Sequence, residues 1–493
     1  MKARRQTRAF VFGRTGQQAE GGEPEMTSRE VVATPRHSLI AVLFLCCAIA
    51  LGGGGSPNPG TELLLQLIFV AAGLAWLWVP AGAGPPPLPR ARSFWLIAAL
   101  VLVLPLIQLV PLPPEVWGRL DGQGDRAAAL ALVGRELCWQ PLSRSPARTV
   151  AAVLAMIPAL FAFFTAASLG ARGRWWLAGA IAAMTLVSAL LGALQVSLGI
   201  FGGPYVYAEN SATLTGFQAN RNATADVLLI GIAAGAAFFL PAVVPRGAAR
   251  DSRAPVPLLG DRRTATILLA VLIAVLFFAT LLTASRVGIA LLPVALVGAW
   301  AILFPALADK RRLRLVPALL ALAAVPVIAF LAWQGGNRAL GTVADRFVVS
   351  GDPRLDLWRD GWFAMNQAWP FGVGVGGAQP ALIAAERLEV LDPFVPNRVH
   401  NDYLELALEG GVFALALLAA IAATLVAAAC RSWLARPQER HLTLLGIVIL
   451  LVAALHSFVD YPLRSMALAC LIGTGAGLLM SAPRRSAAEE PSA

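Results

Sequence analysis

The sequence predicts an all-α protein that crosses a lipid bilayer about twelve times, and two observations predict it. Of its 493 residues, 58% are hydrophobic and only 14% are charged, whereas a soluble domain carries roughly 25% charged residues. Apolar runs of about 20 residues, the length of a spanning helix, also recur along the chain. Because backbone amides inside a bilayer must be hydrogen-bonded within their own segment, such runs are expected to be helices.

The apolar runs, taken in order, define the predicted helices. They lie at residues 38–55, 62–80, 93–110, 147–168, 175–200, 222–244, 264–283, 286–304, 315–334, 409–430, 442–459 and 463–481. Several runs are short, contain Gly or Pro, or are joined by tight turns, so their number is approximate. The chain shows no internal repeat.

The distribution of basic residues predicts how these helices are oriented in the membrane. The formal charge of +11 could indicate nucleic-acid binding, but Lys and Arg concentrate in alternate connections, beginning with the N-terminal tail. Clusters such as Arg262-Arg263 and Lys310-Arg311-Arg312 therefore mark the cytoplasmic side and require no nucleic acid. Residues 1–36 are polar and basic, without the early apolar region of a cleaved signal peptide, so we expect a disordered cytoplasmic tail.

The five cysteines, at positions 46, 47, 138, 430 and 470, form no CxxC pair. Four of them lie in or beside apolar runs, where a thiol behaves as a small hydrophobic group. Neither an intrachain disulfide nor a metal site is expected.

Three outer loops, 111–146, 201–221 and 335–405, are too long to be simple connectors. The largest contains Trp358, Trp362 and Trp369, and such aromatic residues suit a surface at the membrane interface. Residues 353–369 of this loop read as an amphipathic helix, with Leu355, Trp358, Trp362 and Met365 near one stripe.

Two arginines on the predicted outer side are candidate functional groups, because ionisable residues at membrane depth are costly. Arg286 separates two apolar runs, and its guanidinium could bind a phosphate or carboxylate through two parallel hydrogen bonds. Arg354 begins the amphipathic segment. The alternatives are an interfacial arginine that snorkels for Arg286, and pairing with Asp352 or simple solvation for Arg354.

His400 closes the large outer loop and is one of only four histidines. Asp402, Glu405 and Glu409 follow it at spacings of three and four, which place them on one helical face. An imidazole near carboxylates suits general-base catalysis, although a capping or interfacial histidine would fit the same position. His456 and Asp460 could instead brace the helix bundle.

Two further motifs contain polar or glycine residues. Asn220, Arg221 and Asn222 open an apolar run and could bind sugar hydroxyls or phosphate, although Asn220 could simply cap the helix. Residues 370–377 are rich in glycine, but a dinucleotide site needs a preceding strand and a following helix. These glycines more plausibly allow a close turn beside a ligand or another helix.

Taken together, the motifs of residues 210–465 resemble the O-antigen ligase/polymerase family of membrane proteins (the WaaL and Wzy types). The residues that carry the resemblance are Gly216-Phe217-Gln218-Ala219-Asn220-Arg221-Asn222, Ser285-Arg286, Arg354-Leu355-Asp356-Leu357-Trp358, Pro370 through Gly376, His400-Asn401-Asp402-Tyr403-Leu404-Glu405 with Glu409-Gly410-Gly411, and His456-Ser457-Phe458-Val459-Asp460-Tyr461-Pro462. The sequence departs from the family at Val287, usually glycine, and at Arg221, commonly proline.

The resemblance implies a GT-C-like fold and a glycosyltransferase that uses a polyprenyl-diphosphate-linked glycan as its donor. The acceptor would be lipid A-core or a growing glycan, and neither a metal nor a nucleotide sugar would take part. The essential arginines and histidine of the ligases carry over to Arg286, Arg354 and His400. We expect Asn220, Arg221, Asn222, Asn401, Asp402 and Glu405 to bind substrate.

This interpretation divides the chain into four parts. They are a tail (1–36), N-terminal transmembrane helices (37–205), a ligase-like core (206–465) with its outer loop (335–405), and a last helix with a short cytoplasmic tail (466–493). The expected location is the bacterial inner membrane, with the active site facing the periplasm. The alternatives are a transporter or flippase, whose polar residues would mark a substrate path, and an accessory subunit that binds polysaccharide.

Overall fold

The computed structural model describes residues 35–54, 59–80, 85–120, 123–198, 213–244, 261–307, 354–390 and 395–480. Within these ranges the regular secondary structure consists of helices and one short antiparallel pair of strands. Strand β1 (Pro111–Leu112) pairs with β2 (Gln140–Pro141), with Pro111 opposite Pro141.

The described part of the chain contains eight helices that are long and apolar enough to cross a membrane. They are α2 (Pro59–Trp78), α6 (Pro146–Ser168), α7 (Ala171–Leu198), α8 (Arg221–Val243), α9 (Arg262–Leu282), α10 (Arg286–Leu307), α15 (Asp402–Ala435) and α16 (Arg440–His456). Three shorter apolar helices accompany them, namely α1 (Pro35–Leu51), α3 (Arg92–Gln108) and α17 (Met466–Leu479). Each overlaps one predicted run, whereas the predicted run 315–334 lies outside the described residues. The protein is therefore a polytopic membrane protein.

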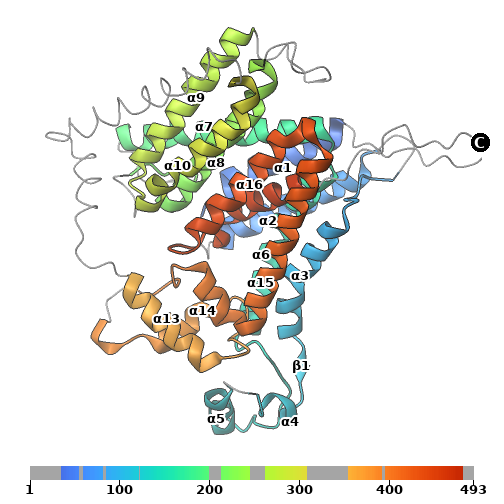
Figure 1. Cartoon of the computed structure of the whole chain (residues 1–493). Helices are drawn as coiled ribbons and strands as arrows, with labels where there is room; N and C mark the ends of the chain where they lie inside the picture. Colours follow the sequence, from blue (N-terminus) through green and yellow to red (C-terminus); the bar gives the residue numbers. More distant parts are fainter. Residues whose placement is uncertain are drawn as a thin grey trace, which may run out of the picture.

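Helix α8 forms the centre of the bundle shown in Figure 1. It is buried along nearly its whole length and packs against α7, α9, α10 and α16. Its many Ala and Gly residues allow this close approach, because small side chains let neighbouring helix backbones lie near one another. The side chain of Asn220 accepts a hydrogen bond from the Asn222 amide at 2.8 Å, which caps the helix at its N-terminus.

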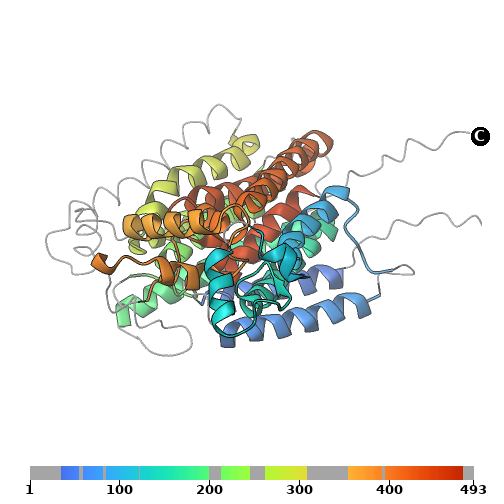
Figure 2. The ribbon, with the colours of Figure 1, turned by 90° about the horizontal axis from the view of Figure 1, so that it is seen from below.

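The outer segments lie together at one end of the bundle, as Figures 1 and 2 show. They comprise α4 (Pro114–Trp117), α5 (Gly124–Leu132), α13 (Arg354–Ala368), α14 (Ala378–Ala385) and the short 3₁₀ helix η3 (Leu388–Val390). Thr149 Oγ1 donates to the carbonyl of Val375 at 2.7 Å, and the Arg144 amide donates to the carbonyl of Val373 at 2.9 Å. The described parts of loops 111–146 and 335–405, both predicted on the outer side, are thus in direct contact.

Helix α13 occupies almost the residues predicted for the amphipathic segment, but its apolar stripe is divided. Met365 is buried and Trp358 is half-buried. Leu355 and Trp362 remain 52% and 59% exposed. One edge of the stripe therefore packs on the protein, while the other edge faces outward.

Helix α15 begins at Asp402, seven residues before the apolar run predicted from 409. The Asn401 side chain caps it by accepting hydrogen bonds from the amides of Tyr403 and Leu404, each at 3.0 Å. The first turns of α15 are polar but buried. A search for long apolar runs therefore could not find the start of this helix.

The glycine-rich segment 370–377 packs against α15, as expected for glycines beside another helix. Helix α15 changes direction at Gly411, whose φ is +56°. The amide of the next residue, Val412, donates to the carbonyl of Pro370 at 3.1 Å. A Cβ at Gly411 would lie only 1.7 Å from that oxygen, so both the conformation and the space require glycine.

We predict that Gly411→Ala destabilises the protein by about 3 kcal/mol or more, because it adds a steric clash to the cost of a left-handed conformation. Thermal unfolding of the purified protein in detergent measures this loss. Gly60→Ala in α2 is the matched control, since a Cβ there meets no atom within 4 Å. Equal melting temperatures for the two variants would contradict the prediction.

Candidate active site

His400 lies immediately before α15 and is held by contacts on three sides. Its Nδ1 is 2.9 Å from Oδ1 of Asp460, and its carbonyl accepts a hydrogen bond from Trp358 Nε1 at 3.2 Å. The ring of Tyr461 packs edge-on against the imidazole, with 4.8 Å between the ring centroids. The φ of His400 is +56°, an unusual conformation for a residue with a Cβ that surrounding contacts must maintain.

The orientation of the imidazole leaves one nitrogen for chemistry. Because Asp460 binds Nδ1, Nε2 is the atom that can accept a proton from another molecule. The His400 side chain is 27% exposed, so its surface is partly accessible. This arrangement suits a general base oriented by a carboxylate.

Asp460 is buried and is held from several directions. Its Oδ2 accepts a hydrogen bond from Asn222 Nδ2 at 2.6 Å. Burial alone would raise the pKa of this carboxyl, but the hydrogen bond to His400 and the nearby positive charges lower the pKa below its ordinary value. Asp460 is therefore an ionised partner for His400 near neutral pH. Tyr461, beside it, has its pKa raised to about 12 by burial and by the charge of Asp460.

Arg354 begins α13 and is half-buried. Its charge acts on both Asp460 and His456, so the guanidinium lies within electrostatic range of the His400–Asp460 pair. The structure thus brings two of the three predicted catalytic residues to one place.

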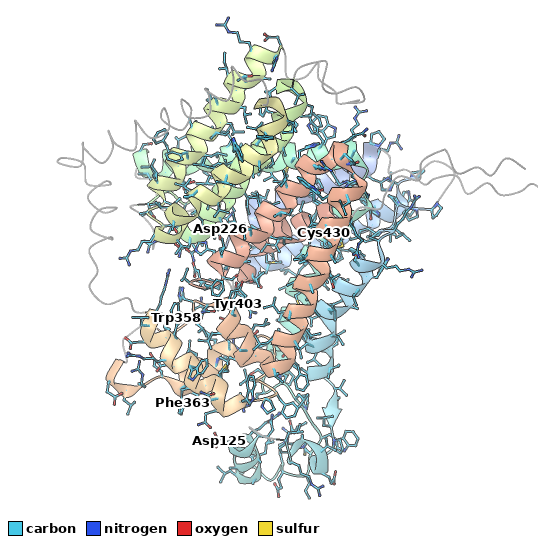
Figure 3. All side chains as sticks on the ribbon, in the orientation of Figure 1. Asp125, Asp226, Trp358, Phe363, Tyr403 and Cys430 are labelled. Carbon is cyan, nitrogen blue, oxygen red and sulfur yellow. The ribbon has the colours of Figure 1, made fainter. Side chains whose placement is uncertain are left out.

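Arg286 begins α10, and its side chain is exposed. The preceding residue, Ser285, donates its hydroxyl hydrogen to Asn222 Oδ1 at 2.7 Å, and Asn222 in turn donates to Asp460. A chain of three hydrogen bonds therefore connects the start of α10 with His400. Figure 3 labels Asp226 on α8, Trp358 on α13 and Tyr403 on α15 around this junction.

Asp402, Glu405 and Glu409 share one buried face of α15, as their spacing predicts, and Arg464 lies among them. Arg464, in the short helix η5 (Pro462–Arg464), places Nη2 2.6 Å from Glu409 Oε2 and Nε 3.1 Å from Glu405 Oε1. Burial would lower the pKa of Arg464, but these acids raise it above its ordinary value. The cation therefore stays charged and neutralises part of the acidic face.

Glu405 also fixes the backbone that leads into His400. Its Oε1 accepts a hydrogen bond from Arg398 Nη1 at 2.9 Å, and its Oε2 accepts one from the amide of Val399 at 3.3 Å. Glu409 extends the network, because its Oε1 accepts from the amide of Gly376 at 2.9 Å. Both acids thus hold segments of the outer loop against α15.

The residues predicted to bind substrate lie around the same junction, and the contacts described for them are within the protein. Asn220 and Asn401 cap helices, and the Asn220 side chain also hydrogen-bonds to Tyr461. Asp402 accepts hydrogen bonds from the Ser457 hydroxyl at 3.0 Å and the Leu463 amide at 3.1 Å. Arg221 is half-buried at the first position of α8. Substrate binding by Asn220, Arg221, Asn222, Asn401, Asp402 and Glu405 stays a prediction.

Sequence reasoning did not single out Arg464 or Arg398, and it treated Asp460 only as a possible brace. Three acids on one face of a helix at membrane depth do require a nearby cation. That requirement could have identified an arginine partner, but it could not choose among the several arginines of the outer segments. Among the described residues, no group of three His, Cys, Asp or Glu side chains is placed to hold a metal ion.

A family model described as O-antigen ligase (Wzy_C) matches residues 268–419. The matched segment covers less than half of the chain. This match confirms the resemblance inferred from the motifs, and it includes Arg286, Arg354 and His400, while Asp460 and Arg464 lie beyond its end. Members of this family are O-antigen ligases or polymerases that act in surface polysaccharide biosynthesis at the bacterial inner membrane. No curated protein matches the chain.

We predict that Glu405→Gln destabilises the protein by about 3 kcal/mol or more, because it leaves Arg398 and Arg464, whose side chains are only 12% and 16% exposed, with one fewer carboxylate. Thermal unfolding in detergent measures the effect. Glu389→Gln, at an exposed acid of η3, is the control and should melt like the unmodified protein. If Glu405→Gln also melts at that temperature, the ionic network does not hold this end of α15.

Proposed function

We propose that the protein transfers a glycan from a polyprenyl diphosphate carrier to lipid A-core or to a growing polysaccharide, at the periplasmic face of the inner membrane. The observation that carries this proposal is the partly exposed His400, oriented by Asp460 beside the charge of Arg354, within an O-antigen ligase domain. The proposal includes the predicted topology, with twelve spans, a cytoplasmic N-terminus and a GT-C-like arrangement.

His400 acts as the general base in this reaction. Its Nε2 accepts the proton of the acceptor hydroxyl, while the oxygen of that hydroxyl attacks the anomeric carbon of the donor. The bond between the anomeric carbon and the diphosphate oxygen breaks, and its electron pair leaves with the diphosphate. Asp460 stabilises the protonated imidazole, as a carboxylate does for other catalytic histidines.

Arg286 and Arg354 bind the diphosphate. A guanidinium keeps its charge and offers two parallel hydrogen bonds to phosphate oxygens. Negative charge on the diphosphate grows as the glycosidic bond breaks, so fixed cations stabilise the transition state more than the ground state. Such a leaving group needs little protonation, and therefore one base is sufficient.

An apolar groove of about 560 Å³ supports a lipid-linked donor. It lies between the outer part of α3 and α15, beneath the start of the glycine-rich segment. Its lining includes Leu104, Ile107, Phe371, Phe413 and Leu417. Phe413 follows His400 by 13 residues, or roughly 20 Å along a helix, a distance that a polyprenyl tail of many isoprene units can span.

We predict that Arg286→Lys and Arg354→Lys each lower the rate of glycan transfer at least about 10-fold, because an ammonium cannot form the paired hydrogen bonds of a guanidinium. The measurement is transfer from a polyprenyl-diphosphate glycan by the purified protein in nanodiscs. Arg359→Lys is the control on α13, since this arginine is 71% exposed and should tolerate the change. Near-normal transfer by Arg286→Lys would reject its role in binding the diphosphate.

Disruption of the gene, followed by electrophoresis of the surface glycans, tests the function in the cell. A ligase predicts the loss of all long chains on lipid A-core and the accumulation of polyprenyl-linked polymer. A polymerase predicts that a single repeat remains on the core. Unchanged glycans together with altered uptake of a solute would reject the transferase and favour a transporter.

A further inference from the structure

A second histidine–aspartate pair lies inside the bundle, next to the first. His456 ends α16, and its Nδ1 is 2.5 Å from Oδ1 of Asp226 on α8. The side chains are 1% and 2% exposed, so neither can reach a substrate in this arrangement. The mechanism above assigns no role to either residue.

The two pairs are connected by helical spacing. Asp226 follows Asn222 by four residues on α8, which places both side chains on the same face of that helix. Asn222 binds Asp460, and Asp226 binds His456. Two polar contacts, one helical turn apart, therefore join α8 to the outer end of α16 and the loop that follows it.

The backbone of His456 also holds Asp460 directly. The carbonyl of His456 accepts hydrogen bonds from the amides of Val459 and Asp460, each at 3.0 Å. The loop from α16 to η5 thus starts from a fixed histidine, and a displacement of His456 would move the carboxylate that orients His400.

Charge connects the two pairs as well. The titratable and charged side chains that face Asp460 are Asp226 on α8, His456 on α16, Arg354 on α13, His400 before α15, and Tyr461 on its own loop. A protonated His456 helps to keep Asp460 ionised, since it is one of the groups that lower the pKa of Asp460. Asp226 holds the imidazole of His456 in place through the hydrogen bond to Nδ1.

We propose that Asp226 and His456 form a positioning pair that holds Asp460 in place and keeps it ionised, and thereby orients His400; this inference rests on the proposed function. A purely structural brace would not need charge, because well-packed apolar side chains usually stabilise a buried contact at least as well as an ion pair. His456 Nε2 also has no hydrogen-bond partner among the described residues, a cost that a brace would avoid.

The test compares His456→Gln and Asp226→Asn with the unmodified protein in nanodiscs. His456→Gln removes one of the groups that lower the pKa of Asp460, so that pKa should rise. Infrared difference spectra, assigned with Asp460→Asn, follow the protonation of Asp460 without any substrate. Asp226→Asn should give a smaller shift, because it also removes a negative charge that faces Asp460.

The rate of transfer provides the second measurement. We expect kcat to fall about 10-fold for a misoriented base, while KM stays within about twofold, because neither residue contacts the substrate.

Thr443→Val is the matched control for a structural effect. Thr443 forms a buried hydrogen bond with Ser432 at 3.0 Å on the same helix as His456, 13 residues or roughly 20 Å away. This variant should lower the melting temperature without changing the titration of Asp460 or kcat.

Unchanged titration of Asp460 in both variants would overturn the positioning role, whatever their activity. If His456→Gln does not fold, kcat and KM of Asp226→Asn, which preserves the shape of the side chain, decide the same question, and an unchanged kcat would overturn the positioning role. A shifted titration in a protein that transfers no glycan would retain the positioning pair and reject the proposed function.

Discussion

The outer end of the protein depends on the burial of Arg464 among Asp402, Glu405 and Glu409. A charge removed from water must be matched by opposite charge and hydrogen bonds, or its segment of the protein will not remain folded around it. Here the matching groups come from α15, from η5 and, through the Gly376 amide, from the glycine-rich segment. This arrangement of the segments pairs the arginine with acids, and the same acids hold the backbone that leads into His400.

Membrane depth explains why so many polar contacts gather at this end. Helices α8, α10, α13 and α15 begin here and α16 ends here, so unpaired amides and carbonyls are concentrated where the bundle leaves the apolar region. Asn220 and Asn401 satisfy two of these helix starts, and Ser285 contributes at a third. The same caps place polar side chains at the edge of the bilayer, where a charged substrate can meet an apolar groove without being drawn into lipid.

The sequence predicted the helices well because the bilayer imposes a length that can be counted. It predicted the helix boundaries less well where a helix begins with buried polar residues in place of apolar ones. Helix α15 begins earlier than its apolar run, because its first turns contain acids that are buried and paired with Arg464. The reactive residue types could be read from motifs, but the pairing of His400 with Asp460 could not, because 60 residues and two long helices, α15 and α16, separate them. Such a pairing depends on helix packing, which local periodicity does not encode.

The two histidine–aspartate pairs show how position decides chemistry. Both join Nδ1 of an imidazole to a carboxylate, and both lie at the outer end of the bundle. His400 follows a loop and keeps its second nitrogen at a partly exposed surface, so it can exchange a proton with a substrate. His456 ends a buried helix, and its second nitrogen has no access to a substrate, so its charge can act only on its neighbours. Under the proposed function, the same two side chains would thus provide a base in one place and the means of orienting that base in the other.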